Sequence, residues 1–243
     1  MSALGHYLEE EGIATVAISL IRPQTENTKP PRALWVPFEL GRPFGPPNDP
    51  AFQRRVILAA LRLLEHEGGP VIIEDFPDDD PRAQPDPGWH APPVPATAAD
   101  GSSEALAARL ESEIPQLQDA HDRWLAQHDR TTVGLSGLAM ADGGRYVADW
   151  VRGKAQPSPR DGFSSILMLR FAVDDLKAYY LEAAAAGAAK PSSRQLGDWL
   201  WNDTAAGAAI IALRAIGLAS DDERLKAVLG NFMVPAVRVA MMS

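Results

Sequence analysis

The 243-residue chain contains no cysteine. This absence excludes disulfide bonds, thiolate metal ligands and any thiol chemistry carried out by the chain itself. Basic residues are also in deficit, since 23 Lys and Arg stand against 32 Asp and Glu, for a formal net charge of −9. A surface of this sign repels phosphate groups, so we expect no nucleic-acid partner.

Long apolar runs are missing as well. The longest nearly apolar stretch, residues 205–219, is shorter than the roughly 20 residues of a membrane helix, and it contains Arg214. The first residues lack the basic start and apolar core of a signal peptide. The sequence therefore predicts a cytoplasmic protein that does not associate with membranes.

Residues 1–75 show the alternation of elements that is typical of an α/β domain. The run 13–21 is rich in β-branched residues and suits a parallel strand buried on both faces. Eight prolines between residues 22 and 50 indicate a stiff, irregular loop. Helices are expected over 3–11 and 51–65, and strands over 13–21, 33–38 and 70–75.

Residues 76–103 are predicted to form an acidic, proline-rich linker or arm. The segment is rich in proline and carries the acidic run 78–80, a composition that argues for an extended conformation. Trp89 interrupts it. The indole could dock on a neighbouring domain or subunit, although packing across its own chain is the commoner outcome.

Residues 104–243 are predicted to form an all-α domain of four or five helices. Two starts carry the pattern of a capping box, beginning at Ser192 and at Ser220. The expected helices are 104–126, 137–151, 164–186, 193–218 and 221–239.

Part of the first block resembles a known family. The segments Gly12-Ile-Ala-Thr-Val16 and Arg42-Pro-Phe-Gly-Pro-Pro-Asn48, followed by Arg54-Arg55, are similar to component B of the glycine/sarcosine/betaine reductases. That selenoprotein group, which includes relatives of D-proline reductase, has a strand, a proline-glycine loop and a helix opening with paired basic residues. The resemblance covers roughly residues 3–64 and implies a short, doubly wound, flavodoxin-like sheet.

The chain departs from this family at its reactive residues. The family's redox chemistry uses selenocysteine or cysteine, and this chain has neither. The family's loop histidine is also missing, because the region reads Leu40-Gly-Arg-Pro-Phe44. The resemblance thus implies a reductase-family component that acts on a small amine or amino-acid-like substrate, with a partner chain that supplies the nucleophile.

A candidate ligand site lies between the second expected strand and the following helix. Open α/β sheets bind ligands at this position, and the site comprises Gly41, Arg42, Gly45, Arg54 and Arg55. The guanidinium groups and the helix N-terminus could bind a carboxylate or phosphate. In the alternative interpretation, Arg42 pairs with Glu39 or Glu74 while the other two arginines lie in solvent.

Two histidines provide a second alternative function. His121 and His128, seven residues apart, could share a helix face and serve a hydrolase or lyase that needs no cysteine. Their spacing is not that of metal ligands on a helix, so we expect no metal site, and no motif indicates a cofactor. An ordinary polar helix face is the competing interpretation.

Other polar residues are interpreted structurally. Ser136 lies between glycines but lacks the full nucleophile-elbow pattern, so it is predicted to cap the next helix. Asp174 and Asp175 are predicted to form a solvated helix face, with a pocket role as the alternative.

A non-catalytic assembly subunit, with a protein partner or a second copy of the chain, is another candidate function.

Overall fold

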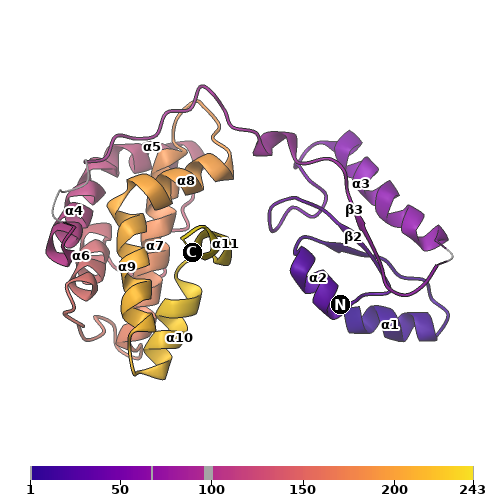
Figure 1. Ribbon diagram of the computed structural model, residues 1–243. Helices are drawn as coiled ribbons and strands as arrows, with labels where there is room; N and C mark the ends of the chain where they lie inside the picture. Colours follow the sequence, from indigo (N-terminus) through magenta and orange to yellow (C-terminus); the bar gives the residue numbers. More distant parts are fainter. Residues whose placement is uncertain (1, 67, 96–100, 243) are drawn as a thin grey trace. The chain divides into compact units, whose positions relative to one another are not determined.

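The computed structural model describes residues 2–66, 68–95 and 101–242 (Figure 1). The chain divides into two compact units, Met1–Gln84 and Pro85–Ser243. The predicted arm is shared between them, because residues 76–84 belong to the first unit and residues 85–95 to the second. Residues 96–100 of the arm lie outside the described residues.

The first unit is an α/β fold with a three-stranded parallel sheet, as predicted. Its strands follow the order β1-β2-β3, which differs from the 2-1-3 start of a flavodoxin-like sheet. The strands are β1 (Ala17–Ser19), β2 (Arg32–Trp35) and β3 (Ile72–Asp75). The helices are α1 (Ser2–Glu10), α2 (Arg22–Thr28) and α3 (Pro50–Arg62), and a 3₁₀ turn (Leu63–Glu65) follows α3.

The two faces of the sheet are covered by different helices. Successive strand residues point to opposite faces, so Leu34 and Val36 face α3 whereas Ala33 and Trp35 face α2. The guanidinium of Arg22, in α2, lies 5.6 Å from the centre of the Trp35 ring. On the α3 side, three phenylalanine rings meet at 5.5–5.9 Å between centroids: Phe38, Phe52 and Phe76.

Two predictions for the first unit are corrected. The β-branched run 13–21 contributes only three residues to β1, and its ends, Ile13 and Ile21, are 55% and 42% exposed. The proline-rich stretch 22–50 is not wholly irregular, because α2 begins with Pro23 in its first turn. Proline is tolerated there, since the first backbone N–H groups of a helix have no partner within the helix.

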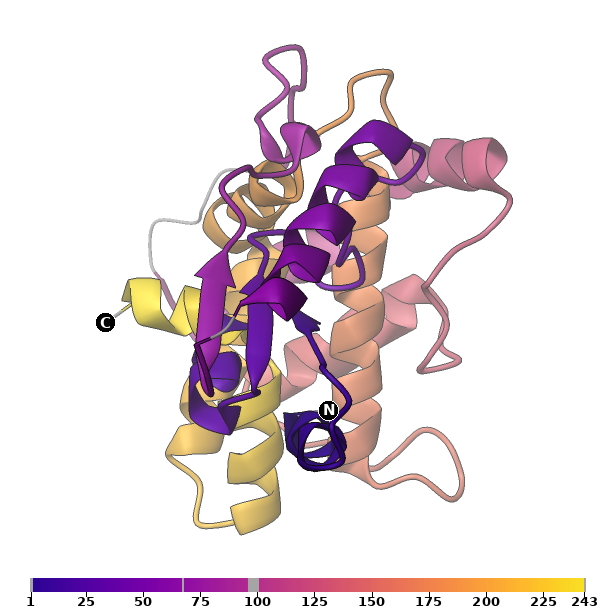
Figure 2. The same ribbon diagram turned by 90° about the vertical axis from the view of Figure 1, so that its right-hand side faces the viewer.

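The second unit is all-α over its described residues, as predicted (Figures 1 and 2). Three of the five expected helices are each divided in two. The helices are α4 (Ser103–Gln116), α5 (Gln118–His128), α6 (Met140–Val151), α7 (Ser165–Ala184), α8 (Ser193–Asp203), α9 (Ala205–Leu218), α10 (Glu223–Phe232) and α11 (Ala236–Met242). Before this unit begins, the first unit ends with a second 3₁₀ turn, Pro81–Ala83.

Local chemistry explains these divisions. Pro115 lies in the last turn of α4, just before the break at Leu117. Thr204 adopts an extended backbone, and its hydroxyl accepts a 3.0 Å hydrogen bond from Gly207 N, so it ends α8 and caps α9. Pro235 lies between α10 and α11. Each break therefore involves a proline or a side-chain cap.

Helix α7 is the centre of the second unit. It packs against α5, α6, α8, α9 and α10, and its buried residues lie on more than one face.

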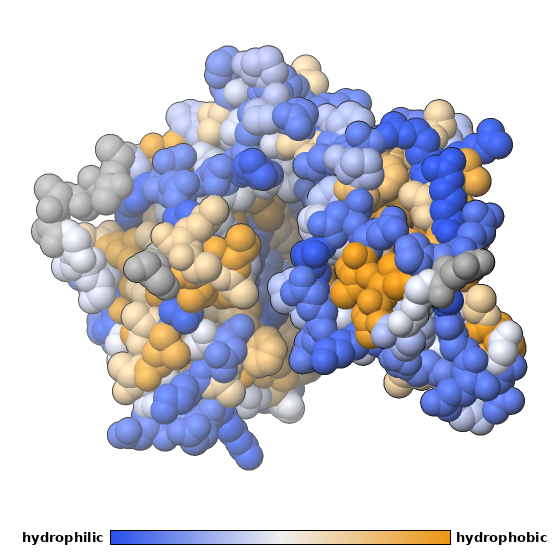
Figure 3. Space-filling view, turned by 45° about the vertical axis from the view of Figure 1, so that its right-hand side comes forward, coloured by the Kyte–Doolittle hydropathy of each residue, from blue (hydrophilic) through white to orange (hydrophobic). Residues whose placement is uncertain are grey.

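The face shown in Figure 3 carries many hydrophilic residues, with apolar side chains gathered in smaller patches. In the part of the chain that the structure describes, no helix combines the length and apolar character needed to cross a membrane.

The described part of the arm in the second unit is bound to its own helices. The backbone of Asp86 exchanges two hydrogen bonds, of 2.8 and 2.9 Å, with the side-chain amide of Gln195. Trp89 Nε1 donates a 3.0 Å hydrogen bond to Ala184 O, in the last turn of α7. The indole thus satisfies a carbonyl that a helix end leaves without an internal partner.

Candidate functional site

The candidate site lies at the carboxyl edge of the sheet, where the connections that follow the three strands meet. Because the strands are parallel, the segments after β1, β2 and β3 begin at this same edge. Three arginines from these connections lie beside carboxylates: Arg22, Arg42 and Arg55.

Two of these arginines make close ion pairs. Arg22 pairs with Asp75 at the end of β3, and Arg55 of α3 pairs with Asp78. The guanidinium of Arg55 also lies 5.3 Å from the centre of the Phe52 ring. These contacts join the connections to one another, and a ligand at either cation would compete with a carboxylate that is already in place.

Arg42 is held more loosely. Its Nη1 lies 3.7 Å from Glu39 Oε2 and 4.0 Å from Asp80 Oδ2, beyond ordinary hydrogen-bond distance, and 46% of its side chain is exposed. The predicted alternative of pairing with Glu39 therefore holds only as a long contact. Arg42 is the cation at this edge that a small anion could reach with the least rearrangement.

The predicted glycines shape the loop through its backbone. Gly41 and Gly45 have φ values of +90° and +83°, a region that favours glycine. A Cβ at Gly45 would lie 2.5 Å from a carbon of the Phe52 ring, so close packing also requires glycine there. Both residues fix the course of the loop on either side of Arg42.

The N-terminus of α3, which is expected from the sequence to help bind an anion, is already capped by a carboxylate of the chain. Asp49 Oδ1 accepts a 3.0 Å hydrogen bond from Phe52 N and thereby caps the helix N-terminus. Arg54 lies on the exposed side of α3. The structure thus brings Arg42 and Arg55 to the same edge and leaves Arg54 facing solvent.

Sequence reasoning missed the acidic side of this site. The sequence pattern predicts that Asp78 and Asp80 belong to the arm, yet both contact arginines of the carboxyl edge. Asp80 is only 4% exposed, and its Oδ1 accepts a 2.8 Å hydrogen bond from Arg82 N. Their position directly after the strand expected at 70–75 was the available signal, since the loop bearing Arg42 also follows a strand.

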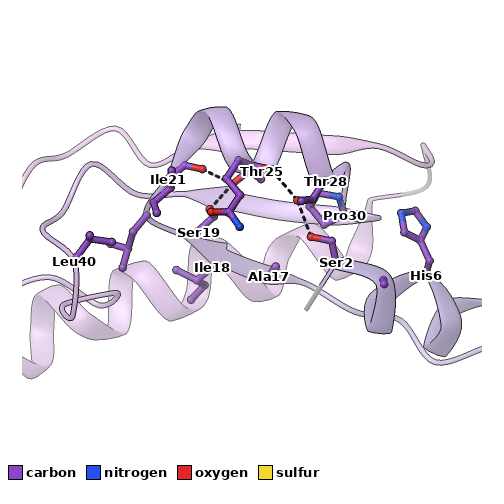
Figure 4. A pocket seen from close by; sticks show the side chains of 13 residues that line it. Ser2, His6, Ala17, Ile18, Ser19, Ile21, Thr25, Thr28, Pro30 and Leu40 are labelled. Carbon is purple, nitrogen blue, oxygen red and sulfur yellow. Dashed lines mark hydrogen bonds between the residues drawn. The ribbon is translucent and has the colours of Figure 1, made fainter. Parts of the chain in front are cut away.

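A groove of about 750 Å³ runs along the open side of β1 (Figure 4). Its lining comes from α1, β1, α2, the residues that follow β1 and α2 (Leu20, Ile21 and Pro30), and Leu40. Hydroxyl groups and apolar side chains both line it, and the Ser19 and Thr25 hydroxyls hydrogen-bond to each other. We call this feature the β1 groove.

The two predicted histidines have different surroundings. His121 is buried, and its Nε2 lies 3.0 Å from Glu182 Oε2. His128 is exposed, stacks on Trp124 and hydrogen-bonds the Trp124 carbonyl. Burial alone would raise the pKa of Glu182, but hydrogen bonds from Thr131, Thr132 and His121 together lower it.

The interpretations of Ser136 and of the aspartates on α7 need correction. Ser136 is fully buried and does not cap α6, whose N-cap is Ala139 without a side-chain hydrogen bond. Asp175 is also fully buried instead of solvated, and its carboxylate accepts hydrogen bonds from Gly134 N, Leu135 N and Ser136 N at 2.7–2.9 Å. The Asp174 side chain is 25% exposed, and its carboxylate pairs with Arg170 and Lys177.

Within the described ranges, no three His, Asp or Glu side chains are grouped closely enough to hold a metal ion. No protein-family model matches the chain, and searches of curated proteins and of solved structures find no match either. The carboxyl edge and the β1 groove are therefore the features of the first unit that bear on function.

Proposed function

We propose that the chain binds a small carboxylate-bearing ligand through Arg42 and acts on it together with a partner chain, as a component related to the glycine/sarcosine/betaine and D-proline reductases. The observation that carries the proposal is the loose pairing of Arg42, a half-exposed cation at the carboxyl edge of a parallel sheet. Carboxylate binding at Arg42 does not require a flavodoxin-like strand order. We expect the protein to work in the cytoplasm.

The contrast among the three arginines supports a binding role for Arg42. Arg22 and Arg55 each have a close carboxylate, so a ligand at either one would compete with a formed ion pair. At Arg42 a carboxylate could form short, charge-assisted hydrogen bonds that Glu39 and Asp80 do not make. In a protein of net charge −9, anion binding must come from such a local group and not from the overall field.

A partner chain is part of the proposal because this chain lacks the nucleophile that the reductive cleavage needs. The chain has no thiol or selenol, so it cannot carry out thiol-dependent reductive cleavage by itself. We expect purified chain alone to show no such turnover of glycine, sarcosine, betaine or D-proline. Turnover without an added partner would contradict this part of the proposal. A purely non-catalytic assembly subunit would give the same negative result but would not bind the ligand.

Calorimetric titration with acetate, glycine, betaine and inorganic phosphate tests ligand binding. Arg42→Ala should weaken carboxylate binding at least about tenfold, since a hydrogen bond to a charged group contributes about 1.5–3 kcal/mol. Arg62→Ala, an exposed arginine at the other end of α3, is the matched control and should bind normally.

A second variant separates competition from loss of structure. Asp80→Asn removes the charge beside Arg42 but keeps an oxygen that can accept the hydrogen bond from Arg82 N. Carboxylate binding should become tighter, because the ligand no longer competes with this charge for the guanidinium. Unchanged affinity in both Arg42→Ala and Asp80→Asn would exclude Arg42 as the binding group.

A further inference from the structure

The strand β1 has an open hydrogen-bonding edge. It pairs with β2 on one side only, and Ser19 O accepts a 2.9 Å hydrogen bond from Val36 N on that side. In a parallel ladder alternate residues turn their backbone groups to the same neighbour, so Ala17 and Ser19 bond toward β2. The backbone N–H and C=O groups of Ile18 consequently point to the open edge, and both Ile18 and Leu20, which directly follows the strand, line the β1 groove.

The sequence around β1 can support a longer strand than the one it forms. Nine residues, 13–21, have the β-branched, apolar composition of a buried strand, yet only three are paired. Ile13 and Ile21, at the ends of the run, remain substantially exposed. A strand-forming segment with a half-satisfied ladder and exposed apolar ends lacks a neighbour on its open side.

The β1 groove also lacks the usual protection of a sheet edge. Natural edge strands carry charged side chains, prolines or bulges that discourage pairing. None of the 13 residues that line the groove is Lys, Arg, Asp or Glu, and His6 is its one ionisable side chain. The strand β1 itself contains no proline. Pro30 does line the groove, but it belongs to the segment between α2 and β2 (Figure 4).

We propose that the β1 groove receives an extended, uncharged segment of a partner protein, which adds to the sheet as a fourth strand beside β1. The groove borders Ala17–Ile21, a length of about 16 Å for five extended residues, and so accommodates a short strand. Main-chain hydrogen bonds to Ile18 and Leu20 supply recognition, and the apolar and hydroxyl lining selects a segment without charge.

A single extended segment fits this groove better than the edge of a second folded copy. The walls are formed by Ser2 and His6 of α1, by Gln24 and Thr28 of α2, and by Leu40. An extended segment needs only the edge itself, whereas a second copy would have to bring its own α1, α2 and Leu40 up to these walls. The inference rests on the proposed function, since it names the docking surface of the partner chain invoked there.

A fluorescein-labelled heptapeptide, Thr-Val-Thr-Val-Thr-Val-Thr with an amidated C-terminus, is the probe. Fluorescence anisotropy with the full chain should show saturable binding. A peptide N-methylated at alternate residues, on the edge that would face β1, should bind at least tenfold more weakly, because it cannot donate main-chain hydrogen bonds. Equal binding of the two peptides, or no binding of either, would overturn the strand-addition proposal.

Two protein variants locate the binding site. Gln24→Lys places a charge on the groove wall and should weaken peptide binding about tenfold, whereas Asn27→Lys, an exposed residue of α2 outside the groove, should leave it unchanged. Hydrogen exchange gives an independent readout. Peptide should slow exchange of the Ile18 and Leu20 amides at least tenfold, and leave those of Ala17 and Ser19, already bonded to β2, unchanged.

The same measurements separate this inference from the proposed function. If the Ile18 and Leu20 amides are already protected in the free chain, the chain covers its own edge and the docking proposal is wrong. Acetate titration on the same sample reports Arg42 independently of the peptide. Retained acetate binding with failed peptide binding would reject only the groove, and the reverse result would reject only the ligand site.

Discussion

Ser136 and Asp175, which lie 39 residues apart in the chain, are joined by two hydrogen bonds inside the helical unit. Ser136 N and Ser136 Oγ both donate to Asp175 Oδ2, at 2.9 and 2.5 Å. Both residues are fully buried, so the serine hydroxyl is committed to a carboxylate in the middle of α7. The glycine-flanked loop is therefore a structural element that α7 organises, and Ser136 has no access to a substrate.

Asp175→Asn should destabilise the protein substantially. The carboxylate accepts three backbone N–H groups and one hydroxyl, and an amide would turn an NH₂ group toward some of these donors. We expect the free energy of unfolding to fall by about 2–4 kcal/mol, measured by urea denaturation. Asp174→Asn, which weakens the partly exposed ion pairs with Arg170 and Lys177, is the control and should change it by about 1 kcal/mol or less. Similar effects in both variants would contradict the assigned role.

Glu182 should make stability depend on pH in a defined direction. Its pKa is lowered in the folded state from an ordinary value of 4.5, because hydrogen bonds from Thr131, Thr132 and His121 outweigh the effect of burial. A carboxyl with a lowered folded pKa stabilises fully above the unfolded value, and this contribution is lost as pH falls through the folded value.

The matching measurement compares wild type with Glu182→Gln, which mimics the protonated side chain. The difference in unfolding free energy should be largest above pH 4.5 and should shrink below it. Denaturant titrations at several pH values between about 3 and 7 give this difference directly. A difference that stays constant over that range would show that the charge of Glu182 adds nothing to stability.

Two glycines of neighbouring helices should respond oppositely to alanine. A Cβ at Gly207, in α9, would lie 2.0 Å from Leu200 O, a backbone atom that cannot move away freely, so Gly207→Ala should destabilise by about 1–3 kcal/mol. Gly197, in α8, has nothing within 4 Å of such a Cβ. Gly197→Ala should stabilise by up to about 1 kcal/mol through helix propensity. Thermal unfolding of the two variants decides between these signs.

Trp89 should control the protease sensitivity of the arm. Its indole N–H donates to Ala184 O, and its ring packs against the helical core. Trp89→Ala should accelerate limited proteolysis near residue 89, while His90→Ala, an exposed neighbour, should not. Trp89→Phe keeps an aromatic ring but removes the donor, so its cleavage rate should fall between the two. Equal cleavage of all three variants would show that the indole does not hold the arm.

Local sequence patterns predicted whether most of the segments form helices or strands. Helical periodicity located the all-α region, and the capping box at Ser192 is present, with Ser192 Oγ accepting a hydrogen bond from Gln195 N. The box expected at Ser220 is wrong, because Asp222 caps α10 by accepting hydrogen bonds from Arg224 N and Leu225 N. Caps and periods depend on residues a few positions apart, which makes them visible in sequence, but neighbouring cap residues compete and only the folded backbone selects one.

The sequence by itself determined the absence of thiol chemistry, the acidic charge, the parallel α/β character of the first unit and the helical character of the second. Only the tertiary structure decided which charges are buried and which cations keep loose partners. Asp175 and Asp174 are adjacent in sequence but differ in burial, because a loop 40 residues away folds over one of them. The position of Arg42 near Asp80 likewise depends on strand pairing across the sheet, which fixes contacts between residues that no local pattern relates.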